Sequence, residues 1–289
     1  MQSNLIIRSM QPGDLAFATE LTAGEGWVSE NRLTLDGFYM HDPHGCLLAE
    51  EAGNPCSKPL GICIATRYGT CGFIGELIVH PDARGLGIGA ALLNHAVKYL
   101  RQCGSHTIYL DGVVKAVPLY ERKGFRKISR SYRFSGILHS KSTPQVRIMQ
   151  KNDLADVFNL DHLAFGADRG FFLARRQSLF PELAHVMLIS KRIIGFILGR
   201  RGEGWIAAGP WVVSPEVVNP LPLLEKLANE VGEVSISLGI LSSNLPAVAL
   251  IRSLGFIERP DSPWRMALGP QDDLGASPQC IAVGSAAKG

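Results

Sequence analysis

The sequence predicts an α+β protein made of two copies of one fold, each copy a mixed, mostly antiparallel sheet flanked by helices. In the first half, short extended runs are separated by turn residues and are joined to runs with apolar residues at helical spacing. In the second half, the same landmarks return in the same order. With 289 residues, of which 46% are hydrophobic, the chain is long enough for two domains that each bury a core.

The first half opens with an extended run and a helix start. Leu5 to Met10 has the pattern of a strand, and Pro12, Gly13 and Asp14 follow as a turn and the beginning of a helix. Three further extended runs come next, with turn residues between them, at Gly45 to Ala52, Pro59 to Arg67 and Gly72 to Val79. We therefore expect an antiparallel meander.

A helix is expected directly after the meander. Apolar residues recur at helical spacing between Gly87 and Cys103, and Gly104 follows as a left-handed cap. The apolar positions are Ile88, Leu92, Leu93, Ala96 and Leu100. The remaining elements expected in this half are a strand at Thr107 to Val113, a short helix from Val117 to Lys123 closed by Gly124, and a strand from Phe125 to Phe134.

The second half repeats these landmarks. Met10, Gln11, Asp14, Leu15 and Ala16 return as Met149, Gln150, Asp153, Leu154 and Ala155; Gly61 and Arg67 as Gly195 and Arg201; Gly75, Val79 and Pro81 as Gly209, Val213 and Pro215; and Leu119, Gly124 and Phe125 as Leu250, Gly255 and Phe256. We expect domains at residues 1–137 and 145–289, joined by the short polar linker Gly136 to Pro144. Beyond Pro270 the chain is rich in small residues, and Cys280 to Val283 is predicted as either a last strand or disorder.

Composition excludes several classes of protein. A formal net charge of +3 with scattered basic residues is not typical of a nucleic-acid surface. The apolar runs are too short for a membrane span, and no basic segment followed by an apolar one stands at the N-terminus. The six cysteines lack the paired spacing of zinc or dithiol sites, so we expect no metal site and reduced thiols in a cytoplasmic protein whose partner is a small molecule.

The segment from Arg84 to Ala90 lies between an expected strand and an expected helix. Backbone N–H groups at a helix start favour an anion, glycine allows a phosphate to approach them, and arginine adds a multidentate donor. The segment is therefore interpreted as a pyrophosphate site, against the plainer interpretation of Gly85, Gly87 and Gly89 as a tight turn. A dinucleotide site with Asp111 as the ribose acid is a further alternative, but it requires the turn to follow the first strand of a parallel sheet.

These residues, together with Leu119, Tyr120, Gly124 and Phe125, resemble the GCN5-related N-acetyltransferase (GNAT) superfamily in a tandem form. In that family the pattern Arg/Gln, any, any, Gly, any, Gly/Ala binds the CoA pyrophosphate, and the backbone of the preceding strand pairs with the pantetheine arm where two parallel strands splay apart. The resemblance implies acetyl-CoA as co-substrate. The residues that it assigns to the cofactor are Leu77, Ile78, Val79, Arg84, Gly85, Leu86, Gly87, Ile88, Gly89 and Ala90.

The resemblance also implies catalytic and substrate residues. Tyr120 lies where the family commonly has the acid that protonates the CoA thiolate, against the plainer interpretation of a half-buried aromatic residue. Glu76 is the nearest candidate for the base that deprotonates the amine, although strand alternation sends it to the opposite face from Leu77. Glu25 and Trp27 resemble a substrate loop of one branch of tandem acetyltransferases, and both could equally be ordinary loop and core residues.

The second copy is predicted to be degenerate. Ser214 to Pro220 replaces the arginine and glycines, Glu216 adds negative charge, and Ile251 stands at the tyrosine position. Phe165 to Arg169 resembles a segment of the second domain of tandem acetyltransferases. Within it, a helix cap for Asp168 and an ion pair for Arg169 are preferred to substrate binding. We expect this copy to shape the substrate cleft or to stabilise the first copy.

The sequence thus predicts an N-acetyltransferase that transfers an acetyl group from acetyl-CoA to a primary amine by direct attack in a ternary complex. The acceptor is left open among aminoglycosides, polyamines, amino acids, protein termini and lysine. Two alternatives belong to other classes. One is a non-catalytic acyl-CoA sensor, and the other is a dinucleotide-dependent oxidoreductase.

Overall fold

The computed structural model describes residues 5–26, 31–52, 58–138, 145–270, 273–287 and 289. The chain divides into two compact units, described in turn below. The first unit comprises Met1–Leu110 with Leu268–Pro270. The second comprises Asp111–Ala267 with Gln271–Ala287.

The first unit contains a five-stranded sheet in the order β1-β2-β3-β4-β5. Strands β2 to β4 form the predicted antiparallel meander, β1 adds antiparallel to β2, and β5 adds parallel to β4. The strands are β1 (Leu5–Ser9), β2 (Cys46–Glu51), β3 (Gly61–Tyr68), β4 (Cys71–Val79) and β5 (Thr107–Gly112).

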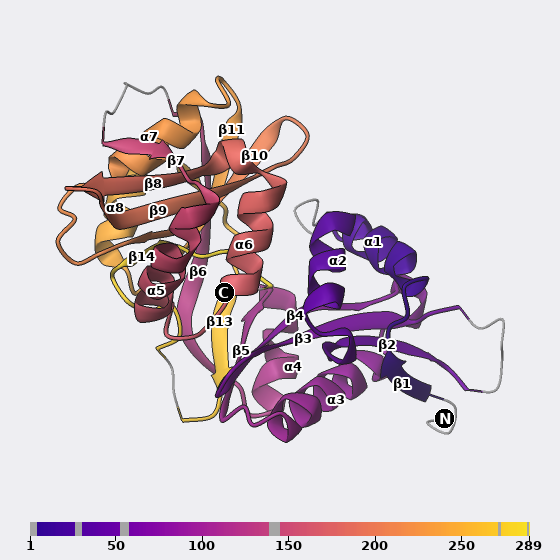
Figure 1. Ribbon diagram of the computed structural model, residues 1–289. Helices are drawn as coiled ribbons and strands as arrows, with labels where there is room; N and C mark the ends of the chain where they lie inside the picture. The colour runs from indigo at the N-terminus through magenta and orange to yellow at the C-terminus, as the bar shows by residue number, and fades with distance from the viewer. Residues whose placement is uncertain (1–4, 27–30, 53–57, 139–144, 271–272, 288) are drawn as a thin grey trace. The chain divides into compact units, whose positions relative to one another are not determined.

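Three helices cover this sheet. Helix α3 (Ile88–Gln102) packs against β2, β3 and β4 through the apolar residues that predicted it, and all five of them are buried. Helices α1 (Asp14–Gly24) and α2 (Arg32–His41) lie on the opposite face (Figure 1). Helix α2 was not predicted, because its apolar residues are interrupted by Gly37 and lack a clear period. Its local signal is the N-cap Asn31, whose side chain accepts a hydrogen bond from the backbone N–H of Thr34.

The second unit has a sheet in the order β13-β6-β11-β10-β9-β8-β7, with β12 also paired to β6 and β14 also paired to β10. Within this sheet β10 and β11 pair parallel, and the other pairings are antiparallel. The strands are β6 (Arg126–Gly136), β7 (Val146–Ile148), β8 (Ala184–Ile189), β9 (Arg192–Arg201), β10 (Trp205–Val213), β11 (Ser235–Leu241), β12 (Ile257–Glu258), β13 (Trp264–Leu268) and β14 (Cys280–Ala282).

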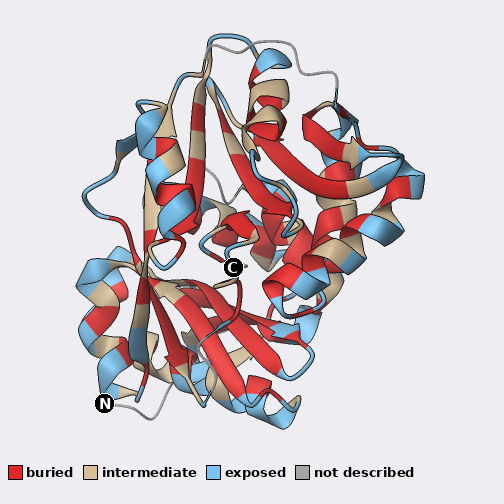
Figure 2. Cartoon of the chain, turned by 90° about the vertical axis from the view of Figure 1, so that its left-hand side faces the viewer, coloured by how far each residue is buried: buried red, intermediate tan, exposed pale blue. Residues whose placement is uncertain are grey.

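Helices α5 (Leu154–Phe165) and α6 (Gly170–Leu179) contact β9, and α7 (Leu221–Asn229) contacts β7, β8 and β9. Helix α8 (Leu245–Ser253) follows β11, and the short α4 (Val117–Arg122) also belongs to this unit. The core includes fully buried Trp211 and Phe134. In each unit, buried residues lie along the strands and on the helix faces turned toward them (Figure 2).

The order of elements confirms two copies of one fold. Strand β1, helices α1 and α2 and the 3-10 turn η1 (Pro43–Gly45) precede the first meander, and β7, α5, α6 and η5 (Pro181–Leu183) precede the second. The division by contacts falls at Leu110, earlier than the predicted boundary of 1–137 and 145–289. The reason is that β6, which belongs to the first copy by sequence, pairs along much of its length with β11. The boundary between the copies stays a prediction.

The segment predicted as either strand or disorder near the end of the chain is a strand, β14. Among the described helices, none is both long enough and apolar enough to cross a lipid bilayer.

Candidate active site

Strands β4 and β5 separate beside the predicted cofactor residues. Their parallel pairing runs from Cys71 with Thr107 to Ile74 with Leu110 and ends there, although β4 continues to Val79. Within the described residues, the second half of β4 has β3 as its strand partner. The backbone of Leu77 to Val79 therefore has one edge along which an extended chain of amides can pair.

A bulge lies in β4 at Glu76. The register with β3 shifts between Ile62 and Ile64, and Glu76 has a left-handed φ of 47°. The simple alternation of side chains used to place Glu76 is therefore broken at this residue. Glu76 is a buried residue, 4% exposed, and it lies close to Cys63. Burial first, and the charge of Glu76 second, raise the pKa of the Cys63 thiol.

The glycine segment connects β4 to the start of α3 through the 3-10 turn η2 (Pro81–Ala83). Gly85 and Gly87 both have a φ of 82°, a left-handed conformation that favours glycine. The first N–H of the helical ladder is that of Ala91, which donates to the carbonyl of Gly87 at 3.1 Å. Within the described part of the chain, the backbone N–H groups of Gly85 to Ala90 donate no hydrogen bond. The first turn of α3 carries no acidic residue. This arrangement suits an anion.

The Arg84 side chain lies against two of the predicted site residues. Its Nε donates to the carbonyl oxygen of Val79 at 3.1 Å, and its guanidinium forms an ion pair with the carboxylate of Glu25. The structure thus brings Glu25, Val79 and Arg84 together. This ion pair could not be predicted from the sequence, because its two residues are 59 positions apart and no local pattern connects them. Trp27 lies outside the described residues.

Tyr120 is a buried residue of α4, 7% exposed, in edge contact with Phe125 at a centroid distance of 6.1 Å. Gly124 has the left-handed φ expected of the glycine that closes this helix, and Phe125 is buried, 3% exposed. Tyr120 belongs to the second unit, whereas Glu76 and the glycine segment belong to the first.

Asp111 takes part in a buried network in the second unit. Its carboxylate accepts hydrogen bonds from Arg265 at 2.5 Å, Arg133 at 2.9 Å and Ser131 at 2.8 Å. Burial alone would raise the pKa of Asp111, but the two arginines outweigh it and hold the pKa below its ordinary value. A carboxylate held in this way is not presented to a ribose, so the dinucleotide alternative loses its acid.

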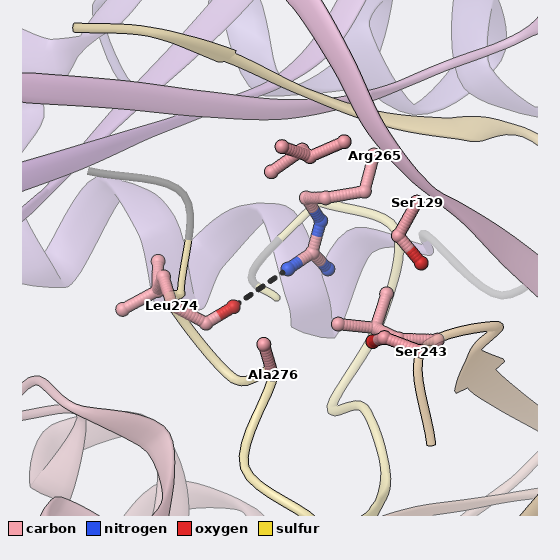
Figure 3. Close-up of a pocket in the computed structure, with 7 residues that line it drawn as sticks. Ser129, Ser243, Arg265, Leu274 and Ala276 are labelled. Carbon is pink, nitrogen blue, oxygen red and sulfur yellow. Dashed lines mark hydrogen bonds between the residues drawn. The ribbon is translucent and has the colours of Figure 1, made fainter. Parts of the chain in front are cut away.

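A small cavity of about 130 Å³ adjoins this network (Figure 3). Arg265 borders it, but its guanidinium donates to the carbonyl of Leu274 at 3.3 Å and to Asp111. The cavity is consistent with a packing gap. Its lining residues are Ile128, Ser129, Leu241, Ser243, Arg265, Leu274 and Ala276. The described residues also contain no cluster of three His, Cys, Asp or Glu side chains suited to a metal ion.

The start of α7, which corresponds to the start of α3 that is predicted to bind phosphate, offers few backbone donors. The N–H of Leu221 donates to the side chain of Asn219 at 3.1 Å, Pro222 has no N–H, and the N–H of Leu223 donates to the carbonyl of Pro220 at 3.2 Å. Glu216 in the preceding loop is paired with Arg192. Pro220 and Pro222 are a further sequence signal for the predicted loss of phosphate binding, beside the missing arginine and glycines and the charge of Glu216.

Strand β14 occupies the splay of the second copy. Pairing of β10 with β11 ends at Ala208 and Leu238, at the position that corresponds to Ile74 in the first copy. Beyond it, β14 pairs antiparallel with Trp211 and Val212, which correspond to Leu77 and Ile78 by the constant offset of the repeat. The N–H of Val283 donates to the carbonyl of Gly239 on β11 at 2.9 Å. The chain itself therefore lies where a pantetheine arm would lie in this copy.

Of the two structural roles preferred for the segment Phe165 to Arg169, the ion pair of Arg169 is confirmed, whereas the N-cap of α6 is Arg169 and Asp168 lies one residue before it. The side chain of Asp168 accepts a hydrogen bond from the N–H of Gly170 at 2.8 Å, at the start of α6. Arg169 is buried and forms a two-pronged pair with Asp161, with both N–O distances at 2.8 Å.

Comparison with known proteins identifies the family. The acetyltransferase (GNAT) family profile matches residues 16–125, and an acetyltransferase (GNAT) domain profile matches residues 157–275. The chain belongs to the GNAT family. It carries two GNAT domains in tandem.

Among curated proteins, the chain is 32% identical over 142 residues to the mycothiol acetyltransferase of Stackebrandtia nassauensis, covering 43% of this chain and 45% of that protein. It is 38% identical over 92 residues to the mycothiol acetyltransferase of Pseudarthrobacter chlorophenolicus, covering 30% and 28%. It is 37% identical over 62 residues to the glucosamine 6-phosphate N-acetyltransferase of Trypanosoma brucei brucei, covering 22% and 42%. The matches thus span less than half of each relative.

Among solved structures, a putative acetyltransferase from Pyrococcus horikoshii has a TM-score of 0.82 at 23% identity, covering 100% of this chain and 97% of that one. A tandem GNAT protein from the clavulanic acid biosynthesis pathway has a TM-score of 0.61 at 15% identity, covering 93% and 100%. These similarities establish the fold.

Proposed function

We propose that the protein transfers an acetyl group from acetyl-CoA to a primary amine, by direct attack within a ternary complex. The observation that carries the proposal is the start of α3. Six successive backbone N–H groups, from Gly85 to Ala90, stand ahead of the helical ladder, in a loop with two left-handed glycines and in the first turn of α3. A row of such donors at a helix start is suited to the pyrophosphate of CoA.

The residues present fit acetyl-CoA, which supplies an activated thioester when bound. Gly85 to Ala90 and Arg84 would hold the pyrophosphate. The free edge of β4 at Leu77 to Val79 would pair with the amides of the pantetheine arm, as an added strand does. Tyr120 is proposed as the donor of a proton to the leaving thiolate.

Glu76 is proposed as the group that helps to remove the proton of the amine. Its carboxyl group is buried, and the left-handed bulge sets it apart from the alternation of β4. The acceptor is proposed to be an amine on a small molecule, because relatives of the chain are named for mycothiol and for glucosamine 6-phosphate.

The first test is a calorimetric titration of acetyl-CoA into the wild-type protein and into an Arg84→Ala, Gly87→Glu variant. We expect micromolar binding, about −8 kcal/mol, that the variant loses. An amine screen that measures free thiol then follows, starting with glucosamine 6-phosphate and other amino sugars, and continuing with polyamines, aminoglycosides, amino acids and peptides. Absence of acetyl-CoA binding, with saturable binding of a nicotinamide dinucleotide, would overturn the proposal.

The second candidate function is a non-catalytic acyl-CoA sensor. A sensor would use the same cofactor site, so only the amine screen distinguishes this function from the enzyme. A sensor binds acetyl-CoA with the same loss in the variant but releases no thiol above the rate without amine. A Tyr120→Phe variant sharpens the comparison, since it leaves binding intact and slows only a catalysed release.

A further inference from the structure

We propose that Glu25 and Arg84 form a latch across the cofactor cradle, and that the pyrophosphate of CoA opens it by taking the guanidinium from Glu25. In this role Glu25 sets the affinity for the cofactor and acts as a positioning residue. The inference rests on the proposed function and concerns the same site.

The latch joins two segments that are distant in the sequence. Glu25 follows the last residue of α1, and Arg84 stands between η2 and the glycine segment. Their ion pair links the end of α1 to the loop that precedes α3. The side chain of Arg84 is therefore directed to a carboxylate in this structure, although the helix start that needs an anion lies only four residues further along the chain.

The exposure of the two partners indicates which one moves. The Arg84 side chain is 46% exposed, whereas the Glu25 side chain is 15% exposed and so is largely covered by its surroundings. A partly exposed ion pair is weak, because solvent screens it. A pyrophosphate offers more oxygens and more charge to the guanidinium than one carboxylate does, and the dipole of α3 attracts it to the same place.

The same movement frees a second group. Nε of Arg84 donates to the carbonyl oxygen of Val79, which is the last residue of the β4 edge proposed to pair with the pantetheine arm. When Arg84 turns toward a pyrophosphate, this carbonyl becomes available to an amide of the arm. One side chain thus connects both halves of the cofactor site, and Glu25 is the residue that holds it in the closed position.

The test is a calorimetric titration of CoA and of ADP into the full-length wild type and a Glu25→Gln variant at low salt. ADP carries a pyrophosphate without a pantetheine arm. The affinity of both ligands is expected to rise about threefold to fivefold in Glu25→Gln, the range that corresponds to one exposed ion pair. The gain should shrink with added salt. Glu20→Gln, which removes an exposed carboxylate from α1, is the matched control and should change affinity little.

A double-mutant cycle with Arg84→Ala provides the second measurement. Because the latch acts through Arg84, the gain from Glu25→Gln should disappear in the Arg84→Ala background. An unchanged or lower affinity in Glu25→Gln, or an equal gain in Glu20→Gln, overturns the latch while leaving the acetyltransferase proposal intact. Failure of the wild type to bind either ligand overturns the proposed function, and the latch with it.

Discussion

One pair of substitutions, Gly87→Ala and Gly69→Ala, distinguishes the effect of backbone strain on stability from the effect of lost phosphate contacts on cofactor affinity. Gly87 and Gly69 both have a left-handed φ, 82° and 65°, and neither has an atom within 4 Å of where a Cβ would be added. Gly69 lies in the turn between β3 and β4, whereas Gly87 caps α3 in the proposed phosphate site. Each change to alanine forces a left-handed backbone on a residue with a side chain, at a cost of about 1 kcal/mol.

The expected stability losses are therefore equal, and each corresponds to a fall in the melting temperature of about 2–4 °C. Only Gly87→Ala places a methyl group in the open space next to the row of N–H groups. Loss of one hydrogen bond to a charged phosphate costs about 1.5–3 kcal/mol, so the Kd for acetyl-CoA should rise about tenfold to a hundredfold. Scanning calorimetry on both variants gives the melting temperature, and titration calorimetry gives the Kd for acetyl-CoA. Equal affinities in Gly69→Ala and Gly87→Ala would refute the placement of the pyrophosphate.

Three further predictions concern the second unit. Burial first lowers the pKa of His185 to about 4, with Glu230 opposing the shift and Lys226 adding to it. Since the unfolded residue titrates near 6.5, the folded state loses about 3 kcal/mol as the pH falls from 7 to 4, and His185→Leu should remove that loss. Asp111→Asn removes the charge partner that the buried Arg265 shares with the partly buried Arg133, and it should cost about 3–5 kcal/mol. Gly209→Ala should cost more than its backbone strain of about 1–3 kcal/mol, because the added Cβ would overlap a backbone carbonyl of the segment after β14.

Urea unfolding followed by tryptophan fluorescence measures all three. For His185→Leu, the difference from wild type should change between pH 7 and pH 4, and a constant difference would contradict the assigned pKa. For Asp111→Asn, a loss below about 1 kcal/mol would show that the network is hydrated. For Gly209→Ala, Gly204→Ala is the matched control, because Gly204 also has a left-handed φ but has open space around its Cβ position. Equal losses in the two would exclude a clash with the tail.

The order and nature of most elements could be predicted from the sequence because their signals are local. The apolar period of α3, the glycines that end α3 and α4, and the turn residues of the meander each act within a few residues. Helix α2 was missed because Gly37 and a polar residue interrupt its apolar pattern. Its residues form a helix because α1 packs against them, and this tertiary contact has no counterpart in the period of the sequence.

The candidate site was predicted in part. The glycine segment could be found because its residues are contiguous and their chemistry is specific. The bulge at Glu76 could not, because a bulge changes the register without changing the pattern of apolar residues. The pair of Arg84 with Glu25 and the pairing of β6 with β11 both join segments far apart in the sequence, where residue spacing carries no information.

The tail strand of the second copy has a consequence for inhibition of the first. In β10, the edge that corresponds to the proposed cofactor edge of β4 is paired with β14, three residues of ordinary polypeptide with small and medium apolar side chains, Cys280 to Ala282. Peptide amides are thus a suitable complement to an edge of this shape. Under the proposed function, a short extended peptide, or a peptidomimetic with the same spacing of amides, is accordingly a rational starting scaffold for ligands that compete with the pantetheine arm in the first copy.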